Sequence, residues 1–206
     1  MSQPLYIYVH GFNSSPHSFK ARQLKSWMEQ QGVGARLRVP ALDHRPQRAI
    51  AQLEQQVRDG DGPVVLLGSS LGGYYATWLT EQHPDLRAVL INPSVRPFEL
   101  MAAYLGENHN LYTGERYLLT PEHQQQLQAL YCPELRDPGR YLLLAQTADE
   151  VLDYREAVAR YAACEQQIEA GGSHGFDHFE RSWGRIFRFA GEPALAEQIE
   201  HELSNR

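Results

Sequence analysis

The sequence predicts an α/β fold in which helices cover both faces of a mainly parallel sheet. Short apolar runs alternate with helical patterns along the whole chain. These runs are continuously apolar, which is typical of strands that are buried on both faces. Gly, Pro, Asp or Asn residues bound most of the runs and mark turns. Together the three observations favour a parallel sheet with crossover helices.

The expected strands are these apolar runs, and all but the last two are rich in β-branched or aromatic residues. They cover residues 5–9, 35–39, 64–67, 88–91, 141–145 and 162–168. Helices are expected between them. Ser15 and Pro16 are typical of the cap and the first-turn proline that begin the first of these helices. The third helix is expected over 71–82 and stops before Pro84. A second helix is expected to begin near Asp43.

Residues 95–137 interrupt the alternation of strands and helices. An apolar helix near residue 100 precedes a loop at 108–114, and Thr120 opens a Gln-rich helix. The segment is either a longer crossover or a small lid over a site at the strand ends. A chain of 206 residues suits a single domain over 1–206 that carries this insertion.

Composition excludes several classes of function. Lys and Arg number 19 against 25 Asp and Glu, a net charge of −6, so we expect no nucleic-acid partner. The two cysteines, Cys132 and Cys164, form neither a disulfide framework nor a CxxC pair, and no metal site is expected. No apolar run is long enough to span a bilayer, and residues 1–10 lack the features of a signal peptide. We therefore expect a cytoplasmic location.

The motif that carries chemistry follows the strand at 64–67 and reads Gly68-Ser69-Ser70-Leu71-Gly72. This is G-x-S-x-G between a strand and a helix, where a sharp turn holds the serine hydroxyl out at the strand end. Ser70 is the candidate nucleophile, because Ser69 would have Leu71 in place of the second glycine. The alternative is a Gly-Ser turn with no chemistry.

A serine nucleophile needs a histidine base, and in this architecture the base comes late in the chain. His174 follows the strand at 162–168 and the Gly171-Gly172-Ser173 loop, which places it at the same sheet edge as Ser70. His178 is a weaker candidate because the pattern from Phe176 predicts a helix. The i, i+4 spacing of the two histidines is only a weak indication of a metal pair.

The acid that orients the histidine is expected just after the strand at 141–145. Asp149 lies in that loop, and Asp153 is the rival, although it also suits the cap of the next helix. Glu150 is expected to point away. The other strand end that could supply an acid reads Asn92-Pro93-Ser94 and offers no carboxylate.

Acyl transfer also needs N–H donors for the oxygen that becomes negative. The backbone N–H groups of Leu71, at its helix N-terminus, and Phe12, after the first strand, are the candidates. His10 is expected to hydrogen-bond the loop rather than to act as a second base. Tyr74, Phe98 and Arg96 are candidates for a substrate pocket, but aromatic residues at helical spacing are more often core, and Arg96 equally suits a structural ion pair.

With these residues identified, the sequence resembles the α/β-hydrolase superfamily, and in particular small bacterial esterases of the YqiA type. The resemblance spans nearly the whole chain through the segments 5–16, 68–75, 91–97, 149–155 and 172–176. It implies hydrolysis of carboxylic esters or thioesters by Ser70, Asp149 and His174 through an acyl-enzyme, without a cofactor. Ser173-His174-Gly175 stands where such a family is expected to have Asn-His-Ala.

The sequence thus leads to a serine esterase acting on a small-molecule ester or thioester. One alternative is a non-catalytic hydrolase-like domain that binds a ligand or a protein. Another is acyl transfer or carbon–carbon bond hydrolysis on the same triad. Dinucleotide and ATP binding are disfavoured, because the first strand is not followed by GxGxxG and the chain has no GxxxxGK[ST]. The oligomeric state is left open.

Overall fold

The computed structural model describes residues 3–205 and contains a six-stranded parallel sheet in the order β2-β1-β3-β4-β7-β8. The strands are β1 (Leu5–Val9), β2 (Leu37–Arg38), β3 (Val64–Ser69), β4 (Leu86–Ile91), β7 (Tyr141–Gln146) and β8 (Glu165–Glu169). All six expected strands are present, and only β2 is much shorter than predicted. Because every strand is parallel, all the carboxyl ends meet at one edge of the sheet.

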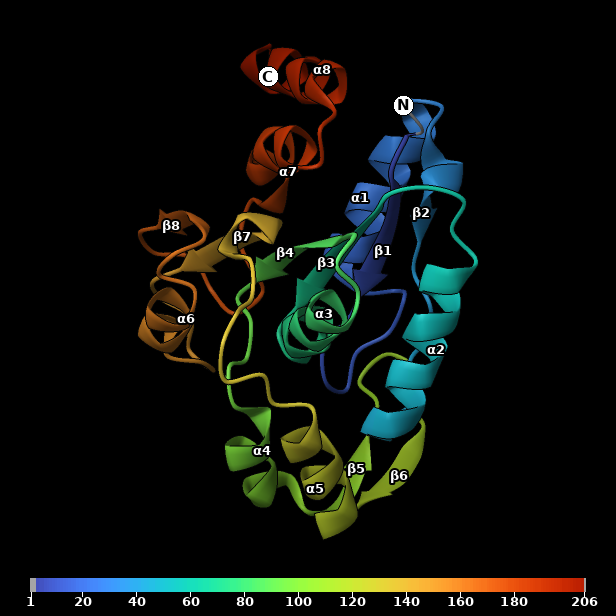
Figure 1. Ribbon diagram of the computed structural model, residues 1–206, viewed down its shortest axis with the longest axis vertical. Helices are drawn as coiled ribbons and strands as arrows, with labels where there is room; N and C mark the ends of the chain where they lie inside the picture. Colours follow the sequence, from blue (N-terminus) through green and yellow to red (C-terminus); the bar gives the residue numbers. More distant parts are fainter. Residues whose placement is uncertain (1–2, 206) are drawn as a thin grey trace.

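Helices cover both faces of this sheet, as the continuously apolar strands predicted. One face carries α2 (Pro46–Arg58), α3 (Leu71–Gln82) and α6 (Tyr154–Arg160), and the other carries α1 (Phe19–Gln30), α7 (Trp183–Phe189) and α8 (Pro193–Ser204). Alternate strand residues enter the two cores: Ile7 and Val9 face α2 and α3, whereas Tyr6 and Tyr8 face α1 and α7. Both termini lie at the upper end of the molecule in Figure 1.

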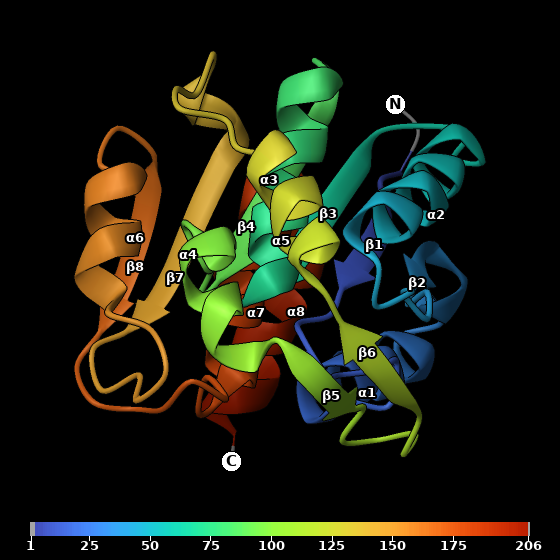
Figure 2. The ribbon, with the colours of Figure 1, turned by 90° about the horizontal axis from the view of Figure 1, so that it is seen from below.

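The segment between β4 and β7 lies at the opposite end. It contains α4 (Pro97–Leu100), a 3₁₀ turn (Met101–Tyr104), the antiparallel pair β5 (Gly106–His109) and β6 (Arg116–Leu119), and α5 (Pro121–Ala129). Seen from below in Figure 2, α4, α5 and the β5–β6 hairpin lie in front of the sheet. The hairpin is fastened to the loop after β1, since the Leu111 N–H donates to the Asn13 carbonyl at 3.1 Å and the Asn110 side chain to the Ser14 carbonyl at 2.7 Å.

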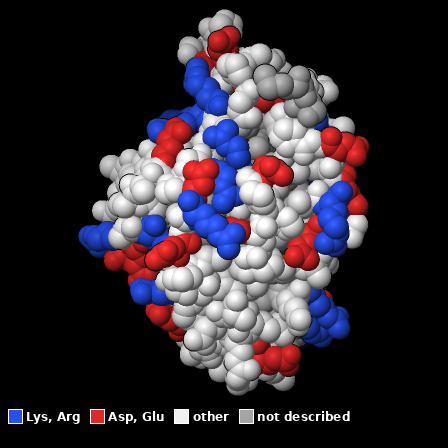
Figure 3. Space-filling view, in the orientation of Figure 1, with Lys and Arg blue, Asp and Glu red and all other residues white. Residues whose placement is uncertain are grey.

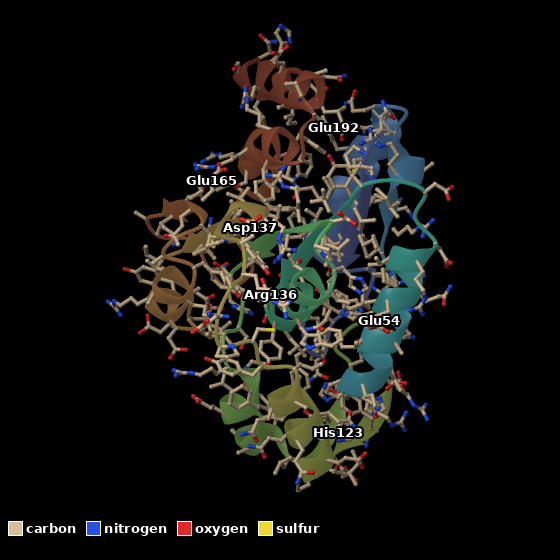
Figure 4. The ribbon with its side chains drawn as sticks, viewed as in Figure 1. Glu54, His123, Arg136, Asp137, Glu165 and Glu192 are labelled. Atoms are coloured by element: carbon tan, nitrogen blue, oxygen red, sulfur yellow. The ribbon has the colours of Figure 1, made fainter. Side chains whose placement is uncertain are left out.

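Part of the surface at this end is uncharged on the face shown in Figure 3. In Figure 3, Lys and Arg side chains gather in the upper middle of the visible face, and the lower centre shows mostly uncharged residues. Several large apolar side chains of the same segment are exposed, among them Leu100, Tyr104, Leu111, Tyr112 and Leu118. His123 on α5 (Figure 4) stacks on His44 with ring centroids 5.7 Å apart, which joins the segment to the loop before α2.

Three local predictions differ from the structure: two helix starts were wrong, and the loop near residue 110 is present but belongs to a hairpin that was not predicted. α1 begins at Phe19 rather than at Pro16, because residues 15–18 form a turn in which the Ser15 hydroxyl accepts the His17 N–H at 3.0 Å. The loop expected at 108–114 is the tip of the β5–β6 hairpin. The helix expected from Phe176 begins only with a 3₁₀ turn at Phe179, since Phe176 and His178 both have positive φ.

Among the described residues, two further 3₁₀ turns lie at Gly34–Arg36 and Pro138–Arg140. Within residues 3–205, no helix combines the length and the apolar character that crossing a membrane requires.

Candidate active site

Ser70 occupies a strained turn between β3 and α3. Its φ of 55° and ψ of −121° lie outside the regions that non-glycine residues favour. Glycines make this turn sterically feasible, because a Cβ on Gly68 would lie 2.5 Å from the Gly72 carbonyl oxygen and one on Gly72 only 1.9 Å from that of Val9. The turn is held by the Ser70 N–H, which donates to the Ile91 carbonyl of β4 at 3.1 Å.

A hydrogen-bonded chain connects Ser70, His174 and Asp149. The Ser70 Oγ lies 3.0 Å from His174 Nε2, and His174 Nδ1 lies 2.8 Å from Asp149 Oδ2. Because an ionised carboxylate only accepts hydrogen bonds, Nδ1 carries the proton and Nε2 is free to accept the serine proton. Three residues from the ends of β3, β7 and β8 therefore meet at the carboxyl edge of the sheet.

Asp149 is buried and held in place from both sides. Its side chain is 2% exposed, and its Oδ1 accepts the backbone N–H groups of Val151 and Leu152, each at 2.9 Å. Burial acts to raise the pKa of Asp149, but the hydrogen bonds from His174 and these two N–H groups outweigh it and lower the pKa below its usual value. The carboxylate is thus charged at neutral pH and fixed in orientation.

The loop that carries His174 is clamped by side chains from neighbouring strands. The Asn92 amide after β4 donates to the Ser173 carbonyl at 2.9 Å, and the Gln146 side-chain oxygen accepts the Ser173 N–H at 3.1 Å. Glu150 accepts the His174 backbone N–H at 2.9 Å, so it points toward the base rather than away as expected. Sequence reasoning missed these roles, although Asn92 and Gln146 both stand at strand ends where polar residues are a usable signal.

The residues of the two candidate N–H donors, Phe12 and Leu71, line one cavity together with Ser70. Leu71 begins α3, so its N–H has no partner within the helix, and Phe12 follows β1 in a loop that lines the space beside Ser70. His10 supports this loop, since its Nε2 accepts the Leu42 N–H at 3.1 Å and its Nδ1 lies 3.1 Å from the Gly11 carbonyl oxygen. Burial lowers the pKa of His10, which keeps its ring neutral at pH 7.

Ser70 and His174 lie between two cavities. One, of about 190 Å³, is mostly apolar and includes Leu100, Met101 and Tyr104 of the insertion. The other, of about 240 Å³, is more polar and lies beside Tyr8, Ser18 and Lys20. The 95–137 segment therefore contributes walls to both cavities, because Leu111 and Tyr112 line the second.

The remaining candidate residues lie away from these cavities. Tyr74 is buried, with its hydroxyl donating to the Leu127 carbonyl at 2.7 Å, and Phe98 packs edge-on against Tyr131. Arg96 pairs with Glu99 at 3.2 Å, which matches the structural alternative considered for it. None of the three lines either cavity beside Ser70.

The rival acid and the rival base also have other roles. Asp153 caps α6 by accepting the Arg155 N–H at 3.0 Å. His178 is exposed and lies 3.7 Å from Glu180. Within residues 3–205, no three side chains of the metal-binding types gather in one place.

Comparison with known proteins supports the assignment of the fold. A model of the family described as "Uncharacterised protein family (UPF0227)" matches residues 5–191. A protein from Agrobacterium vitis S4 is 17% identical with a TM-score of 0.67, covering 94% of this chain and 88% of its own. Mouse alpha/beta hydrolase domain-containing protein 10 is 13% identical with a TM-score of 0.65, covering 100% of this chain and 91% of its own. Est1E from Butyrivibrio proteoclasticus is 14% identical with a TM-score of 0.65, covering 99% of this chain and 88% of its own. The chain has the α/β-hydrolase fold.

Proposed function

The chain belongs to the uncharacterised protein family UPF0227, and on that premise we propose that it is a serine hydrolase that cleaves carboxylic esters. The observation that carries the proposal is the hydrogen-bonded chain from Ser70 Oγ through His174 to Asp149, with distances of 3.0 and 2.8 Å. A serine hydroxyl is a poor nucleophile at neutral pH, and this arrangement is the one that activates it.

In the proposed reaction, Ser70 Oγ attacks the ester carbonyl carbon while His174 Nε2 takes the hydroxyl proton. The carbonyl oxygen becomes negative and accepts hydrogen bonds from the Phe12 and Leu71 N–H groups. The imidazolium, stabilised by Asp149, then gives its proton to the leaving alcohol oxygen as the C–O bond breaks. Water attacks the acyl-Ser70 ester with His174 again as the base, which releases the acid and restores the serine.

Features around the triad support hydrolysis of an ester. The apolar cavity beside Ser70, with Met101 and Tyr104 in its wall, suits a hydrocarbon part of the substrate. Proteins with the same fold include Est1E and metagenome-derived lipolytic enzymes. We further propose that a single domain, 1–206, carries residues 95–137 as the cover that shapes both cavities. A thioester would undergo the same steps with a thiol as the leaving group.

Labelling with a fluorophosphonate tests the proposal directly, because this reagent phosphonylates only an activated serine. We expect wild-type protein to be labelled, and Ser70→Ala to lose both labelling and hydrolysis of 4-nitrophenyl esters. Ser26→Ala, on the exposed side of α1, is the matched control and should label like wild type. Labelling that persists in Ser70→Ala contradicts the proposal, as does an unlabelled wild type that folds normally.

The same series should include acyl-CoA substrates and 4-nitrophenyl esters of increasing chain length. The relative kcat/KM values then separate an ester from a thioester preference and measure the reach of the apolar cavity.

A further inference from the structure

The second cavity beside Ser70 carries a positive charge that the proposed mechanism does not use. Its lining contains one lysine, Lys20, and no Asp or Glu. The Lys20 ammonium donates one hydrogen bond, to the Gly175 carbonyl at 2.6 Å, directly after the base His174. An ammonium has three donors, so two remain for another partner.

The position of Lys20 is unfavourable for the free protein. It lies in the first turn of the twelve-residue helix α1, where the helix dipole is positive and a cation is repelled. Burial lowers its pKa to about 8, and Asp149 is the carboxylate that opposes this effect. Asp149 is itself occupied by His174 and two backbone N–H groups. Lys20 thus bears a half-buried charge without a dedicated counter-ion.

A second, independent feature of the same cavity is the Ser18 hydroxyl. Ser18 is the N-cap of α1, and its side chain would ordinarily accept an N–H from the first turn. It makes no such bond: the residue is 8% exposed, its Oγ caps no backbone N–H, and its polar neighbour is the Tyr8 hydroxyl. Tyr8 and Ser69 also line the cavity, and burial raises the pKa of the Tyr8 hydroxyl, which keeps it protonated.

A lysine ammonium with free donors, the positive end of α1 and a lining without carboxylates surround one space of about 240 Å³, and together they are complementary to an anion. We propose that this cavity binds an anionic group of the substrate, a carboxylate or a phosphate, and that Lys20 and Ser18 make the enzyme selective for anionic over neutral esters. This inference rests on the proposed hydrolase function. The apolar cavity on the other side of Ser70 then receives the uncharged part of the ester.

The net charge of −6 does not oppose such a substrate. Charges on the surface are screened beyond about 8 Å at physiological ionic strength, whereas Lys20 acts at contact distance in a partly desolvated site. Arg96, the cation considered from the sequence, is neutralised by Glu99 and lies outside this cavity.

The test compares kcat/KM for pairs of esters of matched size. In one pair the carboxylate is on the acyl side, as in 4-nitrophenyl hydrogen glutarate against 4-nitrophenyl valerate. In the other it is on the alcohol side, as in 4-acetoxybenzoate against its methyl ester. We expect wild type to prefer the anionic member of at least one pair, and Lys20→Met to reduce that preference by about 10- to 100-fold, the usual effect of losing a charge-assisted hydrogen bond.

Lys25→Met is the matched control, because Lys25 lies on the same helix with its side chain 57% exposed. It should leave the preference unchanged, while Ser18→Ala should reduce it and Lys20→Arg should retain part of it. We also expect inorganic phosphate and glutarate to inhibit wild type competitively and to lose this inhibition in Lys20→Met. The ratio of the two inhibition constants in wild type shows which anion the cavity favours.

Equal losses on both members of a pair in Lys20→Met would overturn the proposal, since Lys20 would then only support Gly175. A wild type without preference in either pair, and without Lys20-dependent inhibition by either anion, would overturn it as well. Ser70-dependent fluorophosphonate labelling in the same preparation keeps that failure distinct from a failure of the hydrolase function.

Discussion

At the residue scale, two carboxylates four positions apart in one loop have different environments. Asp149 is buried and accepts hydrogen bonds from His174 and two backbone N–H groups, whereas Asp153 is half exposed and caps α6. The sequence could rank these residues but not separate them, because both follow β7 within one short loop. The acid is the carboxylate that contacts His174 in the loop after β8. That contact joins segments far apart in the sequence, so a local pattern does not show it.

We predict that Asp149→Asn lowers kcat by about 10³- to 10⁴-fold, because an asparagine fails to hold the His174 tautomer that accepts the serine proton. Asp153→Asn is the matched control, since asparagine also caps helices, and it should stay within a few-fold of wild type. Steady-state hydrolysis of a 4-nitrophenyl ester measures both. If the two losses are reversed, Asp153 is the orienting acid.

At the element scale, the end of β4 supports the loop that carries His174, which follows a strand two places further along the sheet. Asn92 has a φ of 40°, donates to the Ser173 carbonyl and accepts the Gln146 N–H at 2.9 Å. One side chain thereby joins β4, β7 and the His174 loop. Asn92 was excluded as the triad acid because it has no carboxylate. Its neutral amide suits the observed role, since an amide can both donate and accept hydrogen bonds.

We expect Asn92→Gly to lower kcat by about 10- to 100-fold with a smaller effect on KM, because His174 loses its support while the positive φ stays accessible. The free energy of unfolding should fall by about 1–3 kcal/mol, since the Ser173 carbonyl and the Gln146 N–H lose their partner. Kinetics and urea unfolding on the same samples measure both effects. Asn205→Gly, at the far end of α8, is the control. Wild-type kcat in Asn92→Gly would contradict this supporting role.

At the scale of the whole molecule, the two ends of the chain are fastened by a buried polar cluster. Glu192, which precedes α8, accepts a hydrogen bond from the Tyr6 hydroxyl of β1 at 2.5 Å and pairs with Arg36 before β2. Figure 4 places Glu192 between the C-terminal helices and the N-terminal elements. The Arg36 and Glu192 side chains are only 16% and 11% exposed, so screening by water is weak.

We predict that Glu192→Ala reduces the free energy of unfolding by about 3–5 kcal/mol, because Arg36 becomes an unpaired, largely buried charge. Glu197→Ala, at an exposed position of α8, should change it by less than about 0.5 kcal/mol. Urea denaturation followed by circular dichroism measures both variants. Similar, small changes in the two would show that the cluster contributes little to stability.

The sequence by itself determined the parallel sheet, its six strands, and Ser70 and His174 as candidates at one edge. Those features have local signals: continuous apolar runs, and a glycine pattern that only a tight strand-to-helix turn requires. The tertiary structure alone decided what surrounds them. It paired residues 106–109 with 116–119 as a hairpin, removed Tyr74 and Arg96 from the cavities, and placed Lys20 beside Ser70. Such placements depend on contacts between distant segments, and a local pattern does not encode which segment a polar side chain will face.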